Sequence, residues 1–384
     1  MTRRAIVFAL ALVTTGACRR LEPGDPLPGL SAAERARFDS GRVVFDSTFT
    51  PPIGLGPLFN ASGCAECHEE PFSGGIGDEV ERHAAVFHPE RPGFPCDALA
   101  AQGGPVFQDS VTPALRAALG IDKEDLPPGV TTIARRTTPD VLGFGLLDAV
   151  SDSAILANAD PDDGNGDGIS GRPNRFFDGR LGRFGRKALV PSLRDFNDGA
   201  FQIESGITSP SVPNEGTVAG QPLPDGTDPA PDPELNARAL VLNDAFVRLL
   251  APAAPLKQSR EAREGRDVFT QAGCADCHVP VLRTSDSPIG ALRGKDVAAY
   301  TDLLLHDMGA ELADICFGLA TPSEFRTEPL MGLRFSTQFL HDGRATTPEE
   351  AIELHGGEAT RSRDLFRALQ PGQRAALVAF LRTL

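Results

Sequence analysis

Two pentapeptides in the chain share one arrangement of cysteines and histidine. The sequence reads CAECH at Cys64–His68 and CADCH at Cys274–His278. In a C-x-x-C-H motif the two thiols add across the haem vinyl groups, and the adjacent histidine becomes the proximal ligand of the iron. The two residues between the cysteines span the porphyrin edge, so that the next residue reaches the iron. The motifs therefore predict two covalently bound haem c groups, with these attachment residues: Cys64, Cys67, His68, Cys274, Cys277 and His278.

Two other kinds of site use a C-x-x-C pair. A thioredoxin-like redox site needs no histidine after the second cysteine. A zinc site would bring the two motifs close together, whereas here they begin at Cys64 and Cys274. Each motif also has a glycine before its first cysteine and a phenylalanine five residues upstream of it, Phe59 or Phe269. Haem attachment explains this matched pair better than either alternative.

His355 is the best candidate for the second axial ligand of the haem at Cys274–His278. The residues before it have the pattern of a helix start: an N-cap, a first-turn proline and a capping-box glutamate, at Thr347, Pro348 and Glu350. That helix would place His355 on the same face as Ala351 and Ile352 and would end at the Gly-Gly pair that follows. A histidine on an apolar face is more often a core residue, but here a haem must be buried nearby. We therefore expect His355 to bind the iron.

The haem at Cys64–His68 has several candidates for its second axial ligand. A helix over residues 80–87 would turn His83 back toward this haem. His88 is a second candidate, although it stands just before a proline, where a helix would stop. An open site is the third possibility. We expect His83 to be the ligand and Met308 to be a core residue.

A repeat surrounds the two haem motifs. GRVVF at 41–45 resembles GRDVF at 265–269, and the pattern R-T-x-P occurs at 136–139 and again at 326–329. The order is the same in both copies: a helix, a haem motif and then R-T-x-P. A duplicated unit is therefore predicted.

The repeat and the composition together predict the fold class. The 384 residues are 41% hydrophobic and include 40 glycines and 33 prolines, so that both apolar cores and long loops are expected. We predict a mainly α fold with long irregular loops and two tandem cytochrome c-like domains. The predicted parts are a first domain at 31–204, a Pro/Gly-rich linker at 205–234 and a second domain at 235–384.

Residues 1–18 have the pattern of an export signal. Arg3 and Arg4 precede an apolar run, Ala5–Val13, that is too short to span a bilayer. Small residues then lead to Cys18, as in a bacterial lipobox, although Thr15 stands where an aliphatic residue is usual. We expect the mature chain on the periplasmic side of a bacterial envelope, anchored by a lipid on Cys18 to the outer membrane. Plain signal-peptide cleavage is the alternative.

The net charge of −15 argues against a nucleic-acid partner. It suits an acidic surface that meets a basic electron-donor protein. No segment after the signal has the pattern of a membrane span, so that contact with a membrane is expected only through the lipid anchor.

Two cysteines remain after the lipobox and the haem motifs are assigned. They are Cys96 and Cys316, among seven cysteines in all. Cysteines in an oxidising compartment often pair, but the sequence does not give the distance between them. A disulfide and two buried thiols both stay open.

An acidic, glycine-rich segment resembles the first half of an EF-hand loop. Asp163, Asn165 and Asp167 supply oxygen atoms at alternate positions, and Gly168 stands at the sharp turn. The twelfth position is Asn174 and not a bidentate glutamate. We expect a structural Ca²⁺ site here, with a solvated acidic turn as the alternative.

Several segments together resemble the bacterial di-haem oxidoreductases, a family related to the di-haem cytochrome c peroxidases and more distantly to the di-haem enzyme of methylamine utilisation. The resemblance covers nearly all of the chain from about residue 40. Besides the second haem motif, it is carried by GPLFNASGCAECH (56–68), RRTTPDVLGFGLLDAV (135–150), DPDDGNGDGISGRPN (160–174), YTDLLLHDMG (300–309) and FLHDGRATTPEEAIELHGG (339–357).

The resemblance implies roles for particular residues. The peroxidases carry a methionine ligand at the spacing that separates His355 from His341, which implies a bis-histidine second haem with a lower potential. Their removable histidine on the first haem lies one residue further from its motif than His83 does. Their catalytic acid corresponds best to Asp148, and Arg136 (or its neighbour Arg135) could stabilise negative charge.

The chain departs from these relatives in one respect. It has no tryptophan, the residue through which they pass electrons between the haems, and Tyr300 is its only tyrosine. Electrons must therefore follow another route.

The sequence favours a peroxidase. It would reduce hydrogen peroxide, or another small oxidant, with electrons from a small cytochrome c or cupredoxin; the second haem would relay electrons and the first would cleave peroxide. The alternatives are a di-haem electron-transfer cytochrome and a haem-dependent oxygenase or oxidase of an organic substrate.

The motifs predict how many haem groups the chain binds. A pyridine haemochrome assay of the purified chain is expected to find two haem c groups, and EPR in two redox states is expected to show that they differ in spin state. A single haem, or haem that is extracted by acid solvent, would contradict covalent attachment at both motifs.

Overall fold

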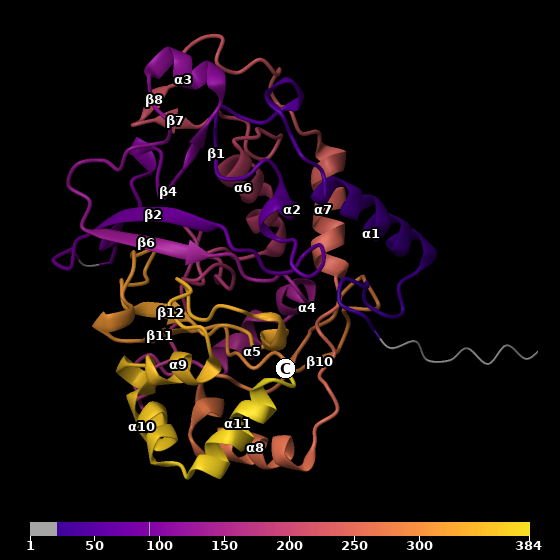
Figure 1. Ribbon diagram of the computed structural model, residues 1–384, viewed down its shortest axis with the longest axis vertical. Helices are drawn as coiled ribbons and strands as arrows, with labels where there is room; N and C mark the ends of the chain where they lie inside the picture. The colour runs from indigo at the N-terminus through magenta and orange to yellow at the C-terminus, as the bar shows by residue number, and fades with distance from the viewer. Residues whose placement is uncertain (1–20, 92) are drawn as a thin grey trace, which may run out of the picture.

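The computed structural model describes residues 21–91 and 93–384 (Figure 1). It is 32% helical and 14% strand, with many loops. The prediction of a mainly α fold with irregular loops is therefore confirmed only in part, because short strands contribute as well. The signal segment and Cys18 lie outside the described residues. Within the described residues, no helix is both long and apolar enough to cross a membrane.

The helices are short and lie between long connections. Their bounds are α1 Ala32–Phe45, α2 Cys64–Cys67, α3 Pro113–Leu119, α4 Phe144–Asp148, α5 Asp152–Leu156, α6 Leu193–Ser205, α7 Ala237–Leu249, α8 Arg260–Gln271, α9 Pro348–Glu353, α10 Thr360–Ala368 and α11 Pro371–Leu381. Two 3₁₀ turns matter for the site, η3 at Cys274–Asp276 and η6 at Gly357–Ala359.

The strands form small antiparallel sheets. Their bounds are β1 Leu58–Phe59, β2 Val80–Phe87, β3 Cys96–Asp97, β4 Val106–Phe107, β5 Ser110–Val111, β6 Thr132–Thr137, β7 Thr217–Val218, β8 Gln221–Pro222, β9 Leu282–Arg283, β10 Asp296–Val297, β11 Leu305–Asp307 and β12 Glu324–Arg326. The pairs are β1–β5, β7–β8, β9–β10 and β11–β12, and β2 pairs with β3, β4 and β6.

Two equivalent helix pairs carry the repeat. α1 packs on α7, and α8 packs on α11 (Figure 1). The glycine of each G-R-x-V-F segment lies where the helices touch: a Cβ on Gly41 would overlap the Leu242 carbonyl oxygen, and one on Gly265 would overlap that of Ala376. Only glycine allows so close an approach of two backbones. The repeated glycine thus sets the same helix crossing in both copies.

The phenylalanine of each G-R-x-V-F segment lies beside a proximal histidine. The ring centroids of Phe45 and His68 are 6.2 Å apart, and those of Phe269 and His278 are 6.4 Å apart. Both phenylalanines are 3% exposed. Each helix pair thus supports one haem motif from the same side.

The first copy contains a sheet where a helix was predicted. Residues 80–87 form β2, which pairs with β6 over six positions, including His83 with Ala134. The prediction that residues 80–87 form a helix with His83 on one face is therefore wrong. Val80, Val86 and Phe87 favour a strand. That strand is stabilised by pairing with residues about 50 positions later, which a local pattern does not show.

The apolar core does not divide at the predicted linker. One continuous cluster joins Phe38 and Phe246 of the first helix pair to Leu303 and Met331 of the C-terminal part. α7 packs on α1, α4 and α6, although its residues were predicted to open the second domain. The predicted start of that domain at residue 235 is therefore not a boundary of the core, because α7 completes the first helix pair.

Cys96 and Cys316 form a disulfide. Their Cα atoms are 5.5 Å apart and their positions differ by 220. The open question about these two cysteines is thus answered, and the bond ties β3 of the N-terminal part to the C-terminal part.

The helix crossings predict a sharp difference between two glycine substitutions. Gly265→Ala is expected to lower the free energy of unfolding by about 3 kcal/mol, because its methyl group would overlap the backbone of α11. Gly372→Ala, in the first turn of α11 with open space around its Cβ, is expected to raise that free energy by about 0.5 kcal/mol. Urea unfolding of both variants measures the difference. Equal effects would show that the crossing does not require glycine.

Candidate haem sites

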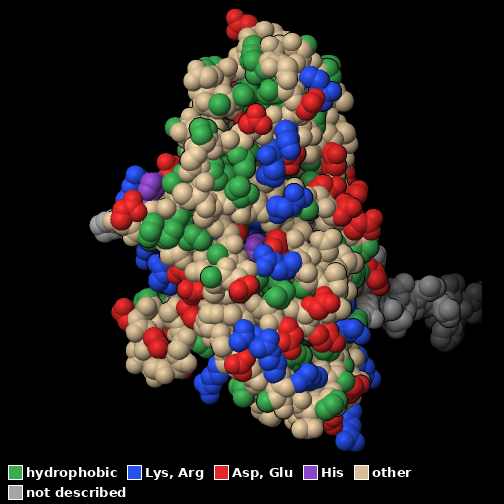
Figure 2. Space-filling model, turned by 60° about the vertical axis from the view of Figure 1, so that its left-hand side comes forward, with side chains coloured by type: hydrophobic (Ala, Val, Ile, Leu, Met, Phe, Trp, Pro, Cys, Tyr) green, Lys and Arg blue, Asp and Glu red, His purple; other side chains and the backbone are tan. Residues whose placement is uncertain are grey.

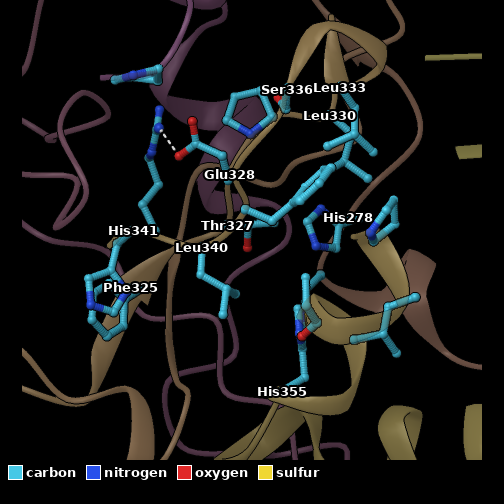
Figure 3. Close-up of a pocket in the computed structure, with 18 of the residues that line it drawn as sticks. His278, Phe325, Thr327, Glu328, Leu330, Leu333, Ser336, Leu340, His341 and His355 are labelled. Atoms are coloured by element: carbon cyan, nitrogen blue, oxygen red, sulfur yellow. Dashed lines mark hydrogen bonds and ion pairs between the residues drawn. The ribbon is translucent and has the colours of Figure 1, made fainter. Parts of the chain in front are cut away.

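The second haem motif opens into a cavity. This cavity has a volume of about 280 Å³ and is lined by Cys274, Cys277, His278 and His355, together with apolar residues of α9 and α11. His278 and His355 both point into it and face each other (Figure 3). The structure therefore brings together the proximal histidine and the ligand predicted for the opposite side of the same haem.

Backbone carbonyls orient both imidazoles. His278 Nδ1 donates to the Tyr300 carbonyl at 2.9 Å, and His355 Nδ1 donates to the Ala351 carbonyl at 2.7 Å. A carbonyl can only accept, so that the proton lies on Nδ1 and the lone pair lies on Nε2, the atom that binds iron. Burial lowers the pKa of His355 and lowers that of His278 to about 4. Both rings are therefore neutral at pH 7, as an iron ligand must be.

The chemistry of these donors fits a haem. Cys274 and Cys277 are free thiols on one side of the cavity, as thioether formation requires. Two neutral imidazoles with free Nε2 atoms complete a donor set for a six-coordinate iron.

The helix before His355 forms as predicted but ends earlier. Thr347 caps α9, its Oγ1 accepting from the Glu350 N–H at 3.1 Å. The Glu350 carboxylate binds Thr346 and does not close a capping box. α9 ends at Glu353, so that His355 lies in the following turn and not on the helix. Ala351, Ile352 and His355 nevertheless line the same cavity.

The first haem motif is held in a similar way. Cys64–Cys67 form α2, and His68 Nδ1 donates to the Gly75 carbonyl at 3.3 Å. Both cysteines are free thiols, and burial raises the pKa of Cys64 to about 12. Burial also lowers the pKa of His68. The donor set here is likewise that of a covalent haem with a neutral proximal imidazole.

Acidic groups surround the first motif. His83 Nε2, the atom that an iron ligand would use, lies 2.8 Å from Glu81 Oε2. Glu204 of α6 lies next to Glu81, and burial together with that neighbour raises the pKa of Glu204 well above its usual value. Glu81 keeps a pKa below its usual value although burial opposes this, because His83 and Glu204 donate hydrogen bonds to it. Both carboxyls also act on the buried Cys67 thiol.

Sequence reasoning missed this acid pair. Glu81 stands only two positions before His83 and could have been noted as a strand neighbour. Glu204 carries no signal, because only the fold brings α6 to the first motif.

Asp148 and Arg136, the predicted catalytic residues, have structural partners. Asp148 Oδ1 accepts from the Leu193 N–H at 2.8 Å, at the start of α6, and its carboxylate pairs with Arg248. Arg136 binds Asp314 through Nε and Nη2, at 3.0 and 2.8 Å. Buried Lys187 lies 2.7 Å from the same carboxylate. These are contacts of a helix cap and of a buried ion cluster, and the catalytic roles stay predictions.

The predicted calcium loop is closed by hydrogen bonds of its own. Asp163 Oδ1 accepts from the Gly168 N–H at 3.1 Å, and Asn165 Oδ1 accepts from the Asp167 N–H at 2.8 Å. Asp167 in turn accepts from Ile169. The Ca²⁺ site stays a prediction, as does the alternative of a solvated acidic turn.

A different group of carboxylates is gathered closely enough to hold a cation. One oxygen from each of Glu215, Asp228, Asp232 and Glu234 lies within 4.8 Å of all the others. Burial and the three neighbouring charges raise the pKa of Glu215 to about 9. Oxygen ligands of this kind suit a hard cation such as Ca²⁺. The linker that contains them carries no EF-hand pattern, so that sequence spacing gave no signal.

Residues 122–384 match the family model described as "Di-haem oxidoreductase, putative peroxidase". This match spans more than half of the chain and includes the second haem motif, His355 and the acidic loop. No curated protein matches the chain.

The solved structures that match the chain are distant from it in sequence. The diheme peroxidase BthA from Burkholderia thailandensis is 16% identical, with 91% of this chain and 86% of that chain covered and a TM-score of 0.43. A MauG-like protein associated with microbial copper homeostasis is 15% identical, with 95% and 94% covered and a TM-score of 0.37. Hydrazine synthase from Kuenenia stuttgartiensis is 14% identical, with 99% and 100% covered and a TM-score of 0.39.

The facing imidazoles predict a spectroscopic change. His355→Ala is expected to convert one haem from low spin to high spin, because it removes one of the two nitrogen ligands. His355→Met is expected to keep that haem low spin and to raise its midpoint potential. His88→Ala is the control for this haem, since His88 binds Glu90 and was a candidate ligand only for the haem at Cys64–His68. Absorption and EPR spectra measure these changes, and an unaltered spectrum for His355→Ala would show that another residue is the ligand.

Proposed function

The chain belongs to the di-haem oxidoreductase family, and from this membership we propose that it is a peroxidase supplied with electrons by a small redox protein. The overall reaction would be H₂O₂ + 2 e⁻ + 2 H⁺ → 2 H₂O. When bound, the two haem irons would supply the redox chemistry, one at the oxygen–oxygen bond and one as an electron store. The protein must then close one iron, leave the other accessible and supply protons there.

The difference between the two histidine environments carries this proposal. His278 is faced by His355 across one cavity, and both rings have a free Nε2. At the first motif, in contrast, the carboxyls of Glu81 and Glu204 both act on Cys67, and Glu81 acts on His68 as well. The Nε2 of His83 is engaged by Glu81. Two imidazoles suit an electron relay, whereas acids beside a haem suit proton transfer.

Glu81 and Glu204 are proposed to act together as the acid–base pair. Their environments push their pKa values apart, so that Glu204 holds a proton while Glu81 is ionised. Such a pair can accept a proton on one carboxyl and return one from the other. Asn60 Nδ2 donates to Glu204 at 3.1 Å and orients it.

The finer architecture is proposed as two cytochrome c-like units. The matching helix pairs, α1 with α7 and α8 with α11, support this, as do their equivalent glycine and phenylalanine contacts. By this proposal α7 closes the first unit.

The electron donor is proposed to be a small basic cytochrome c or cupredoxin. The net charge of −15 supports a cationic partner. Figure 2 shows a face on which acidic and basic side chains are interspersed with hydrophobic ones, as suits a transient contact. We also propose attachment to the periplasmic side of the outer membrane through Cys18.

The proposal predicts a specific loss of activity. Half-reduced protein is expected to reduce hydrogen peroxide at the expense of reduced cytochrome c. Glu81→Gln is expected to lower kcat/KM for peroxide by about 10²-fold to 10⁴-fold, because the base that takes the peroxide proton is lost. Glu69→Gln is the control, since it makes the same charge change at an exposed position beside the motif. Stopped-flow absorption measures both.

The alternatives give different results in the same experiment. Two haems that stay low spin and bind no cyanide after half-reduction would favour an electron-transfer cytochrome. Peroxide that changes the spectrum without consuming reduced cytochrome c would favour chemistry on an organic substrate. No spectral change and no turnover would contradict the peroxidase.

A further inference from the structure

Glu358 is the most densely hydrogen-bonded carboxylate near the second haem site. Its Oε1 accepts from Ser170 Oγ at 2.7 Å and from the Asp307 N–H at 3.2 Å. Its Oε2 accepts from the Ser170 N–H at 3.0 Å and from His306 Nδ1 at 2.8 Å. Four donors from two distant segments thus converge on one side chain that lines the haem cavity.

His306 links this carboxylate to the core. It is 3% exposed, and its Nε2 donates to Asp302 Oδ2 at 2.8 Å. Although burial opposes it, hydrogen bonds with Asp302, Cys277 and Glu358 raise the pKa of His306 to about 12. The charged ring therefore lies between two carboxylates, and its Nδ1 is 3.6 Å from the Cys277 Sγ that would attach the haem.

The partners of Glu358 are themselves rigidly placed. His306 is in β11, which pairs with β12. Ser170 stands at the end of the acidic loop, and the next part of that loop is joined to β11 by two hydrogen bonds of 2.8 Å between Arg172 and Leu305. The acidic loop and β11 are thus bonded to each other, and both donate hydrogen bonds to Glu358.

The segment between His355 and Glu358 needs such a support. It consists only of Gly356 and Gly357, and Gly357 has a φ of 54°. A Cβ on Gly357 would overlap the Asp307 carbonyl oxygen, so that the backbone here presses against β11. Two glycines lose much conformational freedom on folding, and their flexible backbone does not by itself fix the position of His355.

We propose that Glu358 is a positioning residue that holds the His355 segment against β11 and the acidic loop, and thereby keeps His355 on the second haem. The proposal rests on the assignment of His355 as the axial ligand. It gives the acidic loop a role in haem ligation, through Ser170, that does not depend on a bound cation. It also places the Glu358 carboxylate next to His306 Nδ1, which in turn lies 3.6 Å from the haem attachment residue Cys277.

The test compares four variants of the haem-loaded protein. Glu358→Ala removes all four hydrogen bonds, Glu358→Gln removes the charge but keeps an acceptor, and Ser170→Ala removes one bond from the loop side. Glu353→Gln is the matched control, because it makes the same charge change in α9, where Glu353 is bound to Arg367 at the surface. Haem content and thermal unfolding show whether each variant is folded.

The proposal predicts a graded release of His355. Glu358→Ala is expected to give a high-spin second haem that binds cyanide at least about 10-fold more tightly than the parent protein. Ser170→Ala is expected to give a smaller change in the same direction. Glu358→Gln should stay mostly low spin but should have a higher midpoint potential than Glu353→Gln, because the lost charge lies next to Cys277.

Two results would overturn the proposal. One is a low-spin second haem with unchanged cyanide affinity in Ser170→Ala and in both Glu358 variants. The other is an equal shift of potential in Glu358→Gln and Glu353→Gln. If Glu358→Ala does not fold, Glu358→Gln and Ser170→Ala still test the positioning role.

Failure of the proposed function would look different. A protein that releases His355 in Glu358→Ala but turns over no peroxide would support the positioning role and contradict only the peroxidase. A His355→Ala protein with an unaltered spectrum would remove the axial assignment and the positioning role together.

Discussion

The direction in which buried imidazole nitrogens point is the constraint on which the rest of the structure depends. His278 and His355 can both bind one iron only if each offers a neutral Nε2 to the same space. Carbonyl oxygens of Tyr300 and Ala351 impose this by taking the Nδ1 protons. Burial reinforces it, because a charged ring would lose more hydration than a neutral one. The loop around Tyr300 and the helix α9 that supply these carbonyls are therefore as necessary as the ligands themselves.

The helix pairs serve this constraint by fixing the walls of each site. Gly41 and Gly265 let two helices approach until their backbones touch, and Phe45 and Phe269 then lie beside the proximal rings. The repeated framework explains why the two motifs are attached alike. The difference between the sites comes from what is added to each framework: a second imidazole after α9 in one, and a sheet with an acid pair in the other. The proposed division of labour between the two haems would follow from these additions to a common framework.

Two redox sites can cooperate only while their separation is constant, and several interactions join the halves of this chain. The continuous core that contains Phe246 and Met331 spans both. The disulfide between Cys96 and Cys316 adds a covalent link. Arg136, Asp314 and Lys187 add a buried ion cluster, in which loss of one partner would leave an unpaired charge in the interior.

The sequence alone predicted those features that depend on short motifs. The C-x-x-C-H spacing predicted the six attachment residues, the Thr347 cap located the helix before His355, and the repeated G-R-x-V-F segments identified equivalent helices. Each of these depends on neighbours within about ten positions, where side-chain type and spacing constrain the backbone directly. Long-range contacts decided the rest of the fold. The segment around His83 is a strand because it pairs with β6, and α7 belongs with the first half because it packs on α1. Glu204 lies beside Glu81 only because the fold brings α6 there. Local residue patterns are silent on such partners, because a strand pair or an acid pair is stabilised by groups that meet only after the chain has folded.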